Sequence, residues 1–418
     1  MSTRDEAPAV PGRGRRSPAA GAPFAAPRDV AVAPSWLAVN RLAQRDPLGA
    51  AEVDGFLAQH ASPIVEGPYA TFLWRGAAEQ VLVRHAVIAL PRPLHLRRLA
   101  GTDLWAKTIA LPDSARVEYQ LERVGGAPGA HRFNDPLNPR LGWGPFGAQS
   151  VCAATGYQDP EWAEADPAAG RGSLVDLPIA SRSLLREVRV QVYLPAGFRP
   201  GGRSPLLVVH DGADFLQYAA FRTVLDNLIQ RREVEPLVAA FVSAGPQRLV
   251  EYAADPRHAV FLVRELLPAL FRRFRFVGGP DERTLMGSSF GGIAALSTAA
   301  RYPGRFGSLL LESASLVFTD GRGGRRGGPA FAPVLRFVDA YRADPQPVVR
   351  RMFVSCGTFE PLVTPNRAMV QVFRRAGIDV RYEEAPDGHQ WVAWRDRLRS
   401  ALTFLHPGSL AGQNGAQR

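Results

Sequence analysis

The sequence contains few of the residues that form covalent or metal cross-links. Its two cysteines, Cys152 and Cys356, lie far apart and in no metal-ligand spacing, so we predict neither a disulfide framework nor a metal site. No apolar run approaches the roughly 20 residues of a membrane-spanning helix. The arginines near the N-terminus are not followed by the hydrophobic segment of a signal peptide. We therefore expect a cytoplasmic protein without metal, cofactor or membrane contact.

Positive charge is in excess, and nearly all of it is arginine. The chain carries 50 Lys and Arg against 39 Asp and Glu, for a formal net charge of +11. This balance favours an anionic ligand, although an arginine-rich surface in a compositionally biased chain would give the same count. No basic block is interleaved with aromatic residues, so we expect no nucleic-acid partner. Nothing in the sequence indicates an oligomeric state.

The most informative stretch spans residues 283–296 and reads as strand, tight turn and helix. Within it, Gly287-Ser288-Ser289-Phe290-Gly291 matches G-x-S-x-G, the nucleophile elbow of α/β-hydrolases. A serine hydroxyl is a weak nucleophile unless it is exposed at a sharp turn beside a base. Glycines on either side let the strand and the helix approach closely. The pattern predicts that Ser289 is the nucleophile of an ester or acyl transfer reaction.

The first part of the chain has the pattern of a small all-β domain. Aromatic and β-branched runs alternate with Gly and Pro at residues 70–75, 80–85, 105–111 and 116–121. We predict a β-sandwich domain over residues 34–150 and a Pro- and Gly-rich connector over 151–180. Residues 1–33 and 407–418 are expected to be disordered tails.

Residues 181–406 alternate between apolar strands and amphipathic helices. Strands are expected at 186–194, 205–210, 237–242, 308–312, 352–355 and 380–382, and helices at 221–229, 258–274, 333–341, 366–375 and 391–405. Such alternation predicts an α/β fold with a mostly parallel sheet and helices on both faces. Together with the elbow, it predicts an α/β-hydrolase catalytic domain.

The remaining catalytic candidates follow from chain order, which in α/β-hydrolases is Ser, acid, His. His389 lies in the loop between the last strand and the closing helix and is the candidate base. Glu360 is the only carboxylate in the loop after strand 352–355, where the acid should lie. Asp387 is the alternative, although a residue so close to His389 bends back onto its ring with difficulty.

The oxyanion hole of this fold uses two backbone N–H groups. One should come from Phe290, the residue after the nucleophile. The other should come from the loop that follows an earlier strand, where we predict Gly212 or its neighbour.

With these residues in place, the chain resembles the enterochelin (enterobactin) esterase family, whose members have an immunoglobulin-like β domain before an α/β-hydrolase domain. The similarity covers roughly residues 50–405. It rests on residues 287–292 for the elbow, 387–395 for the histidine loop, 210–212 and 248–252 for two further loops, and 71–76 and 99–105 in the β domain.

The resemblance implies hydrolysis of the ester backbone of a siderophore, with release of iron after uptake. It makes Ser289, His389 and Glu360 the catalytic residues and places Arg248 and Trp391 beside the substrate. An arginine-lined mouth suits an anionic ferric catecholate.

The chain also departs from the family pattern. Residues 312–318 hold a single aromatic residue where the family has several, and Phe215 stands where the family often has Trp. Two other functions therefore stay open: a general carboxylesterase or acyltransferase that acts on another acylated small molecule or sugar, and a catalytically inactive ligand-binding homologue.

Overall fold

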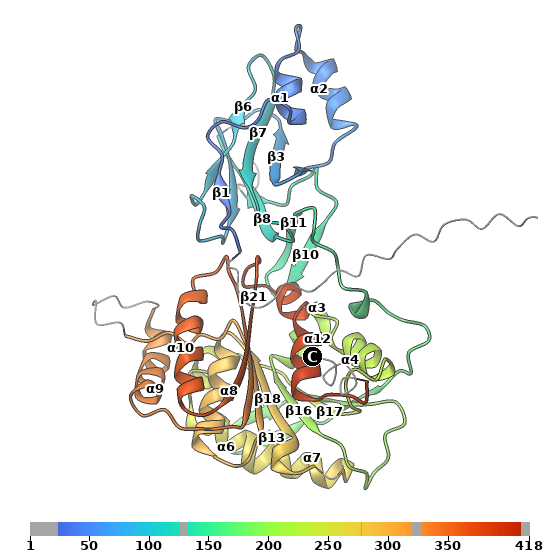
Figure 1. Ribbon diagram of the computed structural model, residues 1–418, viewed down its shortest axis with the longest axis vertical. Helices are drawn as coiled ribbons and strands as arrows, with labels where there is room; N and C mark the ends of the chain where they lie inside the picture. Colours follow the sequence, from blue (N-terminus) through green and yellow to red (C-terminus); the bar gives the residue numbers. More distant parts are fainter. Residues whose placement is uncertain (1–23, 126–131, 277, 320–327, 411–418) are drawn as a thin grey trace, which may run out of the picture.

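The computed structural model describes residues 24–125, 132–276, 278–319 and 328–410, which form a β-rich lobe and an α/β lobe (Figure 1). The β-rich lobe comes first in the chain, and strands β10 and β11 lie on its side nearer the α/β lobe (Figure 1). The predicted tails at residues 1–23 and 411–418 lie outside the described residues.

The β-rich lobe consists of two antiparallel sheets. One contains β1 (Arg28–Asp29), β7 (Leu104–Ala110), β3 (Tyr69–Arg75), β2 (Ile64–Glu66) and β6 (Arg97–Arg98). The other contains β10 (Leu141–Gly144), β11 (Gly147–Ala153), β8 (Arg116–Val124), β4 (Gln80–His85), β5 (Leu94–His95) and β9 (Arg132–Phe133). Apolar side chains from both sheets share one buried core, as expected of a sandwich.

Two short helices cover the outer face of the first sheet. They are α1 (Ala38–Ala43) and α2 (Ala50–Leu57), and they pack on Leu73 of β3 and Leu104 of β7. This packing explains why β3 is buried along nearly its whole length instead of alternating between buried and exposed residues.

The structure departs from the predicted domain boundaries at both ends. Residues 24–33, expected to be disordered, include β1, in which Arg28 and Asp29 pair with Ala110 and Ile109. Residues 407–410 also have partners, because the N–H of Gly408 donates to the Glu233 carbonyl at 2.9 Å. Backbone pairing of this kind depends little on side chains, so composition did not reveal it.

The predicted connector over 151–180 is too long at both ends. Strand β11 runs on to Ala153 within the sandwich, and β12 (Ser173–Asp176) belongs to the large sheet of the second lobe. Dense Gly and Pro concealed the β10–β11 hairpin, in which Gly144 pairs with Gly147 across a tight turn.

The second lobe is built on an eight-stranded sheet. Its order is β12, β15 (Val190–Leu194), β17 (Val238–Val242), β16 (Leu206–His210), β18 (Arg283–Ser288), β19 (Ser308–Glu312), β20 (Arg351–Gly357) and β21 (Asp379–Ala385). Pairings from β17 to β21 are parallel, and β15 is antiparallel to both neighbours. The predicted strand over 186–194 is divided, because β14 (Arg186–Val188) pairs instead with β13 (Ile179–Ser181).

Helices cover both faces of this sheet, and each face has its own apolar core. One face carries α6 (Pro256–Val260), a π-helical segment (Phe261–Leu266), α7 (Leu267–Phe274), α8 (Phe290–Arg301), α9 (Ala332–Ala343) and α10 (Val363–Arg375). The other carries α3 (Gly212–Tyr218), α4 (Phe221–Gln230), α11 (Trp391–Arg395) and α12 (Leu398–Leu405). Short helical segments occur at Arg248–Glu251 (α5), Glu161–Ala163, Pro280–Glu282 and Pro329–Phe331. The expected α/β-hydrolase fold with an N-terminal β-rich lobe is confirmed.

Strand order places the carboxyl ends of β16 and β18 at a switch point. The chain passes from β16 to β17 on one side and then returns to β18 on the other side of β16. Ligands of open α/β sheets bind at such a point, outside the carboxyl ends of the strands. His210 ends β16 and Ser288 ends β18, so the loops that begin with Asp211 and Ser289 lie together there.

Candidate active site

The elbow is a strained turn that holds Ser289 between β18 and α8. Ser289 has φ 55° and ψ −122°, a conformation that a side-chain-bearing residue adopts only when its surroundings impose it. A Cβ on Gly287 would lie 2.2 Å from the carbonyl carbon of Gly291, so only glycine permits this close approach of strand and helix. The local sequence therefore produces the sharp turn that a nucleophile elbow requires, with Ser289 half-buried at it.

Contacts of Ser289 tie it to the end of the neighbouring strand. Its N–H donates to the carbonyl of Glu312 at 3.0 Å, and its carbonyl accepts from the N–H of Ser315 at 3.0 Å. Its hydroxyl lies 3.4 Å from the hydroxyl of Ser315. Within the described residues, no hydrogen bond joins the predicted nucleophile Ser289 to the predicted base His389.

The predicted base and acid, by contrast, meet directly. Nδ1 of His389 lies 2.6 Å from Oε2 of Glu360. The other carboxylate oxygen, Oε1, accepts from the hydroxyl of Ser313 at 2.5 Å and from the N–H of Gly357 at 3.0 Å. Burial opposes the charge on Glu360, but hydrogen bonds led by that from His389 outweigh it and hold its pKa below the usual value. An ionised Glu360 requires the proton of the imidazole on Nδ1 and leaves Nε2 as the basic nitrogen.

Asp387, the alternative acid, faces a different partner. Its Oδ1 accepts from the guanidinium of Arg397 at 2.5 Å, and both side chains are buried. Burial raises the pKa of Asp387 to about 6, although Arg397 counteracts this rise. The carboxylate that touches the imidazole of His389 is thus that of Glu360.

Two residues that sequence reasoning missed complete this arrangement. Nε1 of Trp394 donates to the hydroxyl of Ser313 at 3.0 Å, and Ser313 in turn donates to Glu360. The indole of Trp394 also meets the ring of His389 edge-on, with centroids 5.0 Å apart. The one available signal was positional, since Ser313 directly follows a strand that ends at the catalytic edge of the sheet.

The loop after β16 lies against the start of α8, where the oxyanion hole is predicted. A Cβ on Gly291 would come within 3.2 Å of the Cβ of His210. Gly212 opens α3, and a Cβ there would lie 2.3 Å from the carbonyl carbon of Phe241. Phe290 is the first residue of α8, and N–H groups in the first turn of a helix have no partner within it. The N–H groups of Phe290 and Gly212 thus belong to adjoining helix starts.

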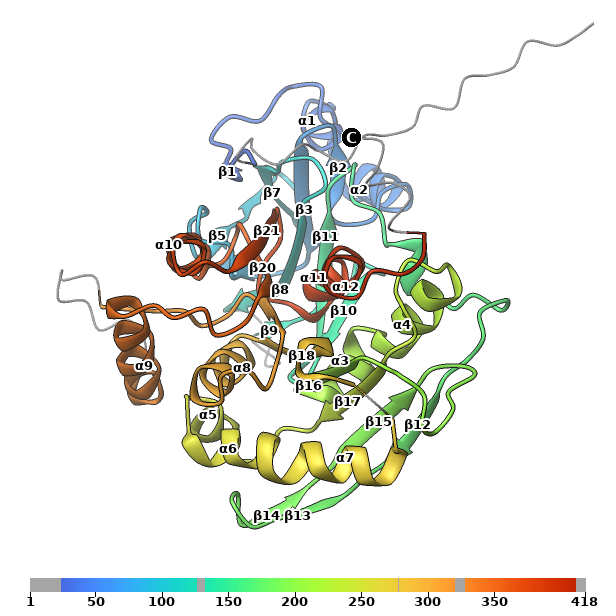
Figure 2. The same ribbon diagram turned by 60° about the horizontal axis from the view of Figure 1, so that its bottom comes forward.

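Arg248 and Trp391, the predicted substrate contacts, both contact the segment that follows β16. Arg248 forms a bidentate pair with Asp211, with N–O distances of 2.6 and 2.7 Å, and its side chain is 30% exposed. Trp391 packs edge-on against Phe215 at 5.1 Å, and Phe215, which is fully buried, supports it from beneath. Strand β10 of the first lobe packs on α3 and α11, next to Trp391 (Figure 2).

Two buried histidines lie behind the oxyanion loop. Nδ1 of His210 donates to the Met286 carbonyl at 2.7 Å, so its Nε2 accepts from Nε2 of His258 at 3.1 Å. Burial lowers the pKa of both rings, and for His258 the charges of His210 and Arg186 lower it further. Asp211 raises the pKa of His210, while Arg248 lowers it.

Because His210 and His258 are buried as neutral rings, we expect the stability of the protein to depend on pH. Because the folded-state pKa values lie below the unfolded value of about 6.5, the unfolded chain binds more protons just below that pH. The free energy of unfolding should therefore fall as the pH drops below about 6.5, by up to about 1.4 kcal/mol per pH unit for each histidine. We expect His258→Gln, which keeps an N–H for His210, to reduce this slope in urea denaturation between about pH 5 and about pH 7. Equal slopes in both proteins would contradict the assignment.

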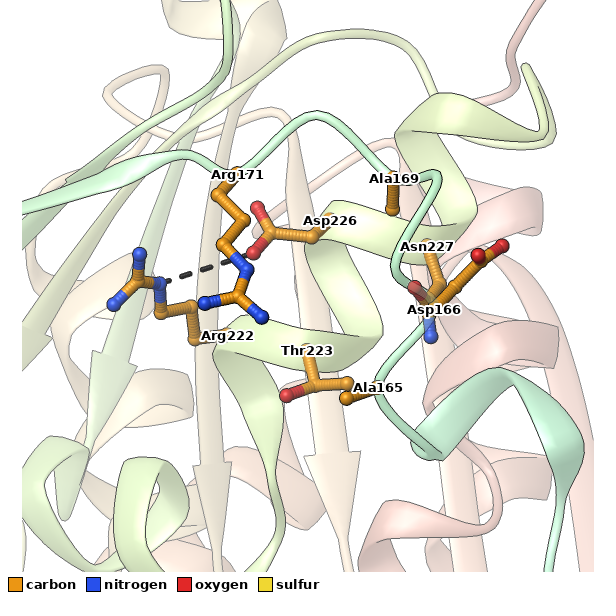
Figure 3. Close-up of a pocket in the computed structure, with 8 residues that line it drawn as sticks. All are labelled: Ala165, Asp166, Ala169, Arg171, Arg222, Thr223, Asp226 and Asn227. Atoms are coloured by element: carbon orange, nitrogen blue, oxygen red, sulfur yellow. Dashed lines mark ion pairs between the residues drawn. The ribbon is translucent and has the colours of Figure 1, made fainter.

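A separate pocket lies away from these residues, between the connector and α4 (Figure 3). An ion pair between Arg222 and Asp226, at 3.8 Å, lies along its wall, and Arg171 reaches into it. None of the predicted site residues lines it. Elsewhere, the described ranges contain no group of three or more metal-binding side chains. No helix in those ranges is both long and apolar enough to cross a membrane.

Comparison with known families identifies the fold and the chemistry. The family model described as "Putative esterase" matches residues 181–405, more than half of the chain. The chain belongs to this esterase family. A second family model, for the N-terminal domain of enterochelin esterases, matches residues 69–165. Both matches confirm the predicted enterochelin esterase family, and the protein is a carboxylic ester hydrolase.

Curated relatives and solved structures agree with this assignment. The chain is 24% identical to the iron(III) enterobactin esterase of Escherichia coli O6:H1 over 370 residues, which covers 80% of this chain and 90% of the relative. It is also 24% identical to the enzyme of the same name from Dickeya dadantii, covering 84% of this chain and 92% of the relative. The crystal structure of the enterobactin esterase from Shigella flexneri in the presence of enterobactin matches with a TM-score of 0.66 at 22% identity, covering 84% of this chain and 97% of that one.

Proposed function

We propose that the protein is a serine esterase that hydrolyses the ester backbone of a ferric catecholate siderophore such as enterochelin, and that it releases iron in the cytoplasm. The contact between His389 and Glu360 beside the Ser289 elbow carries the catalytic part of the proposal. The choice of a siderophore as the substrate is supported by the match of the first lobe to enterochelin esterases and by the names of the relatives.

The proposed reaction starts at the hydroxyl of Ser289, which attacks the ester carbonyl as Nε2 of His389 takes its proton. The resulting oxyanion accepts hydrogen bonds from the N–H groups of Phe290 and Gly212. His389 then protonates the departing alkoxide, which leaves an acyl-enzyme. A water molecule that loses its proton to His389 attacks the acyl carbon, and the carboxylic acid and free Ser289 are released.

The hydroxyl of Ser289 is held only weakly before it enters this reaction. The contact that its hydroxyl makes with Ser315 is long, at 3.4 Å, and rotation about one bond would break it. The N–H of Ser289 donates to the carbonyl of Glu312, and the hydroxyl of Ser313, the residue after Glu312, donates to Glu360. The nucleophile and the acid–base pair are therefore anchored to consecutive residues at the end of β19. Catalytic hydrogen bonds are often long in enzymes without substrate and tighten when it binds.

Arg248 and Trp391 would hold the substrate. Arg248 is partly exposed beside the oxyanion loop, and its charge suits an anionic catecholate. Trp391 offers an aromatic face for a catechol ring, close to the loop that bears His389.

A panel of esters tests the substrate. We expect kcat/KM for the ferric complex of a cyclic tri-serine catecholate to exceed that for a simple aryl ester by at least about 100-fold, because binding of remote groups can be used in the transition state. Chromatography of the released catecholate-serine units measures this rate. The rate for the anionic ferric complex should fall as salt is added, whereas the rate for a neutral aryl ester should stay constant.

The panel also separates the other two functions. Preference for an unrelated acylated sugar or small molecule would indicate a general carboxylesterase or acyltransferase. A wild-type protein that hydrolyses no ester on the panel would indicate an inactive ligand-binding homologue.

A further inference from the structure

The two loops that carry Glu360 and His389 are also the loops that contact the β-rich lobe. Phe359, next to Glu360, is 2% exposed, and its ring lies within the apolar core of the sandwich. Its carbonyl accepts a hydrogen bond from the N–H of Ile88 at 2.9 Å. The acid loop is thus anchored in a different lobe from the one that supplies the nucleophile.

The histidine loop is held from the same side. The backbone N–H of Arg116, in β8, donates to the carbonyl of Pro386 at 3.1 Å. Its guanidinium donates to Oε1 of Gln390, the residue after His389, at 3.2 Å. Arg116 is itself buried and fixed by Glu118 at 2.7 Å, so this contact comes from a rigid side chain.

Backbone hydrogen bonds also join the two loops to each other. The N–H of Phe359 donates to the carbonyl of Asp387 at 3.0 Å, and that of Thr358 donates to the carbonyl of Ala385 at 2.8 Å. A shift of Phe359 would therefore move both Glu360, the next residue, and the segment before His389. Small displacements of this kind are costly, because a misplacement of about 1 Å can reduce a rate about 100-fold.

We infer that the β-rich lobe positions the acid and the base of the catalytic site, through Phe359 in its core and Arg116 on the histidine loop. This inference rests on the proposed function. It gives the first lobe a role in the chemical step, in addition to any contact it makes with substrate. Both positioning residues act through their neighbours, Phe359 through Glu360 and Arg116 through Gln390 and His389.

A matched pair of full-length variants tests the inference. Phe359→Leu removes the ring that enters the sandwich from the acid loop, whereas Phe72→Leu removes a ring from the same core on β3, where it packs on Tyr119 at 4.8 Å. We expect Phe359→Leu to lower kcat by about 10- to 100-fold with little change in KM, and Phe72→Leu to retain kcat within about threefold. Equal kcat values for two folded variants would overturn the inference.

A second variant leaves the core untouched. Gln390→Ala removes the side chain that accepts a hydrogen bond from Arg116 and keeps the ion pair between Arg116 and Glu118. We expect a lower kcat and a weakened or exchange-broadened downfield proton signal from Nδ1 of His389 in NMR spectra, because the imidazole loses a fixed position against Glu360. Wild-type kcat together with an unchanged signal would contradict a positioning role.

The test of the positioning role does not depend on which substrate the enzyme prefers. Rates are measured with a small aryl ester and by labelling of Ser289 with a fluorophosphonate, and neither depends on a siderophore. If the wild type reacts with both reagents but not with a ferric catecholate, the substrate proposal fails and the positioning test still stands. If the wild type labels and the Phe359→Leu and Phe72→Leu variants label at the same rate, the positioning inference fails alone.

Discussion

Replacement of Ser289 by alanine is expected to lower kcat for ester hydrolysis by about 10⁵-fold or more, since the acyl-enzyme can no longer form. Position 289 is singled out because the elbow between β18 and α8 holds this serine at φ 55°, half-buried at the carboxyl edge of the sheet. Alanine is tolerated in the same turn about as well as serine, so the variant should fold. Steady-state hydrolysis and fluorophosphonate labelling both measure the loss.

A serine farther along the same helix is the control for this variant. Ser297 is buried in α8, and its hydroxyl bonds to the carbonyl of Ala294 at 3.2 Å, far from any reacting group. Ser297→Ala should retain kcat within about twofold and shift the free energy of unfolding by about 1 kcal/mol. Esterase activity that survives in Ser289→Ala but not in Ser297→Ala would mean that the nucleophile lies elsewhere.

The fold and the candidate site could be predicted wherever residue type determines backbone geometry. Glycine at 287 is needed for the sharp turn at Ser289, glycine at 291 lets α8 pack closely on His210, and both are visible in the sequence as G-x-S-x-G. Continuous apolar runs such as residues 205–210 and 237–242 indicated strands buried on both faces, and both became inner strands of the parallel sheet. Chain order alone then located the loops of Glu360 and His389 at one edge.

Features that depend on distant backbone pairing could not be predicted in this way. The β10–β11 hairpin lies in a segment rich in Gly and Pro where no strand was predicted, and β1 lies in a segment predicted to be a tail. Strands β1 and β10 are short and mostly exposed, so they carry no apolar alternation that a sequence pattern could reveal. The sequence also gave no sign that Phe359 enters the core of the other lobe, since one buried aromatic residue in a loop has no periodicity to reveal its partner.

Asp387 shows a further limit of sequence reasoning about charged residues. The sequence left Asp387 open as an alternative acid despite its closeness to His389, and only its pairing with Arg397 shows that it holds the loop together instead. This pair lies within a buried charged cluster, because Glu312 and Arg397 also interact. Charged partners that are ten or more residues apart are set by tertiary packing, which a single sequence does not display.

Exchange of each carboxylate for its amide separates these two roles. Glu360→Gln should lower kcat by about 10³- to 10⁴-fold, because an amide that donates to Nδ1 favours the wrong tautomer and no longer stabilises the imidazolium. The pKa of Glu360 lies below its usual value, so above about pH 5 the wild type already has this residue ionised and the loss should persist at neutral pH. Measurement of kcat over about pH 6 to about pH 9 for both proteins gives the comparison.

Asp387→Asn should have the opposite profile, with kcat reduced by no more than about tenfold and a free energy of unfolding lower by about 3 kcal/mol, because Arg397 loses the charge that compensates it in a buried site. Urea denaturation measures the stability of both amide variants under the same conditions. A larger loss of kcat in Asp387→Asn than in Glu360→Gln would exchange the two assignments. It would also require the 2.6 Å contact between Glu360 and His389 to be structural, even though Glu360 carries the negative charge that an imidazolium needs beside it.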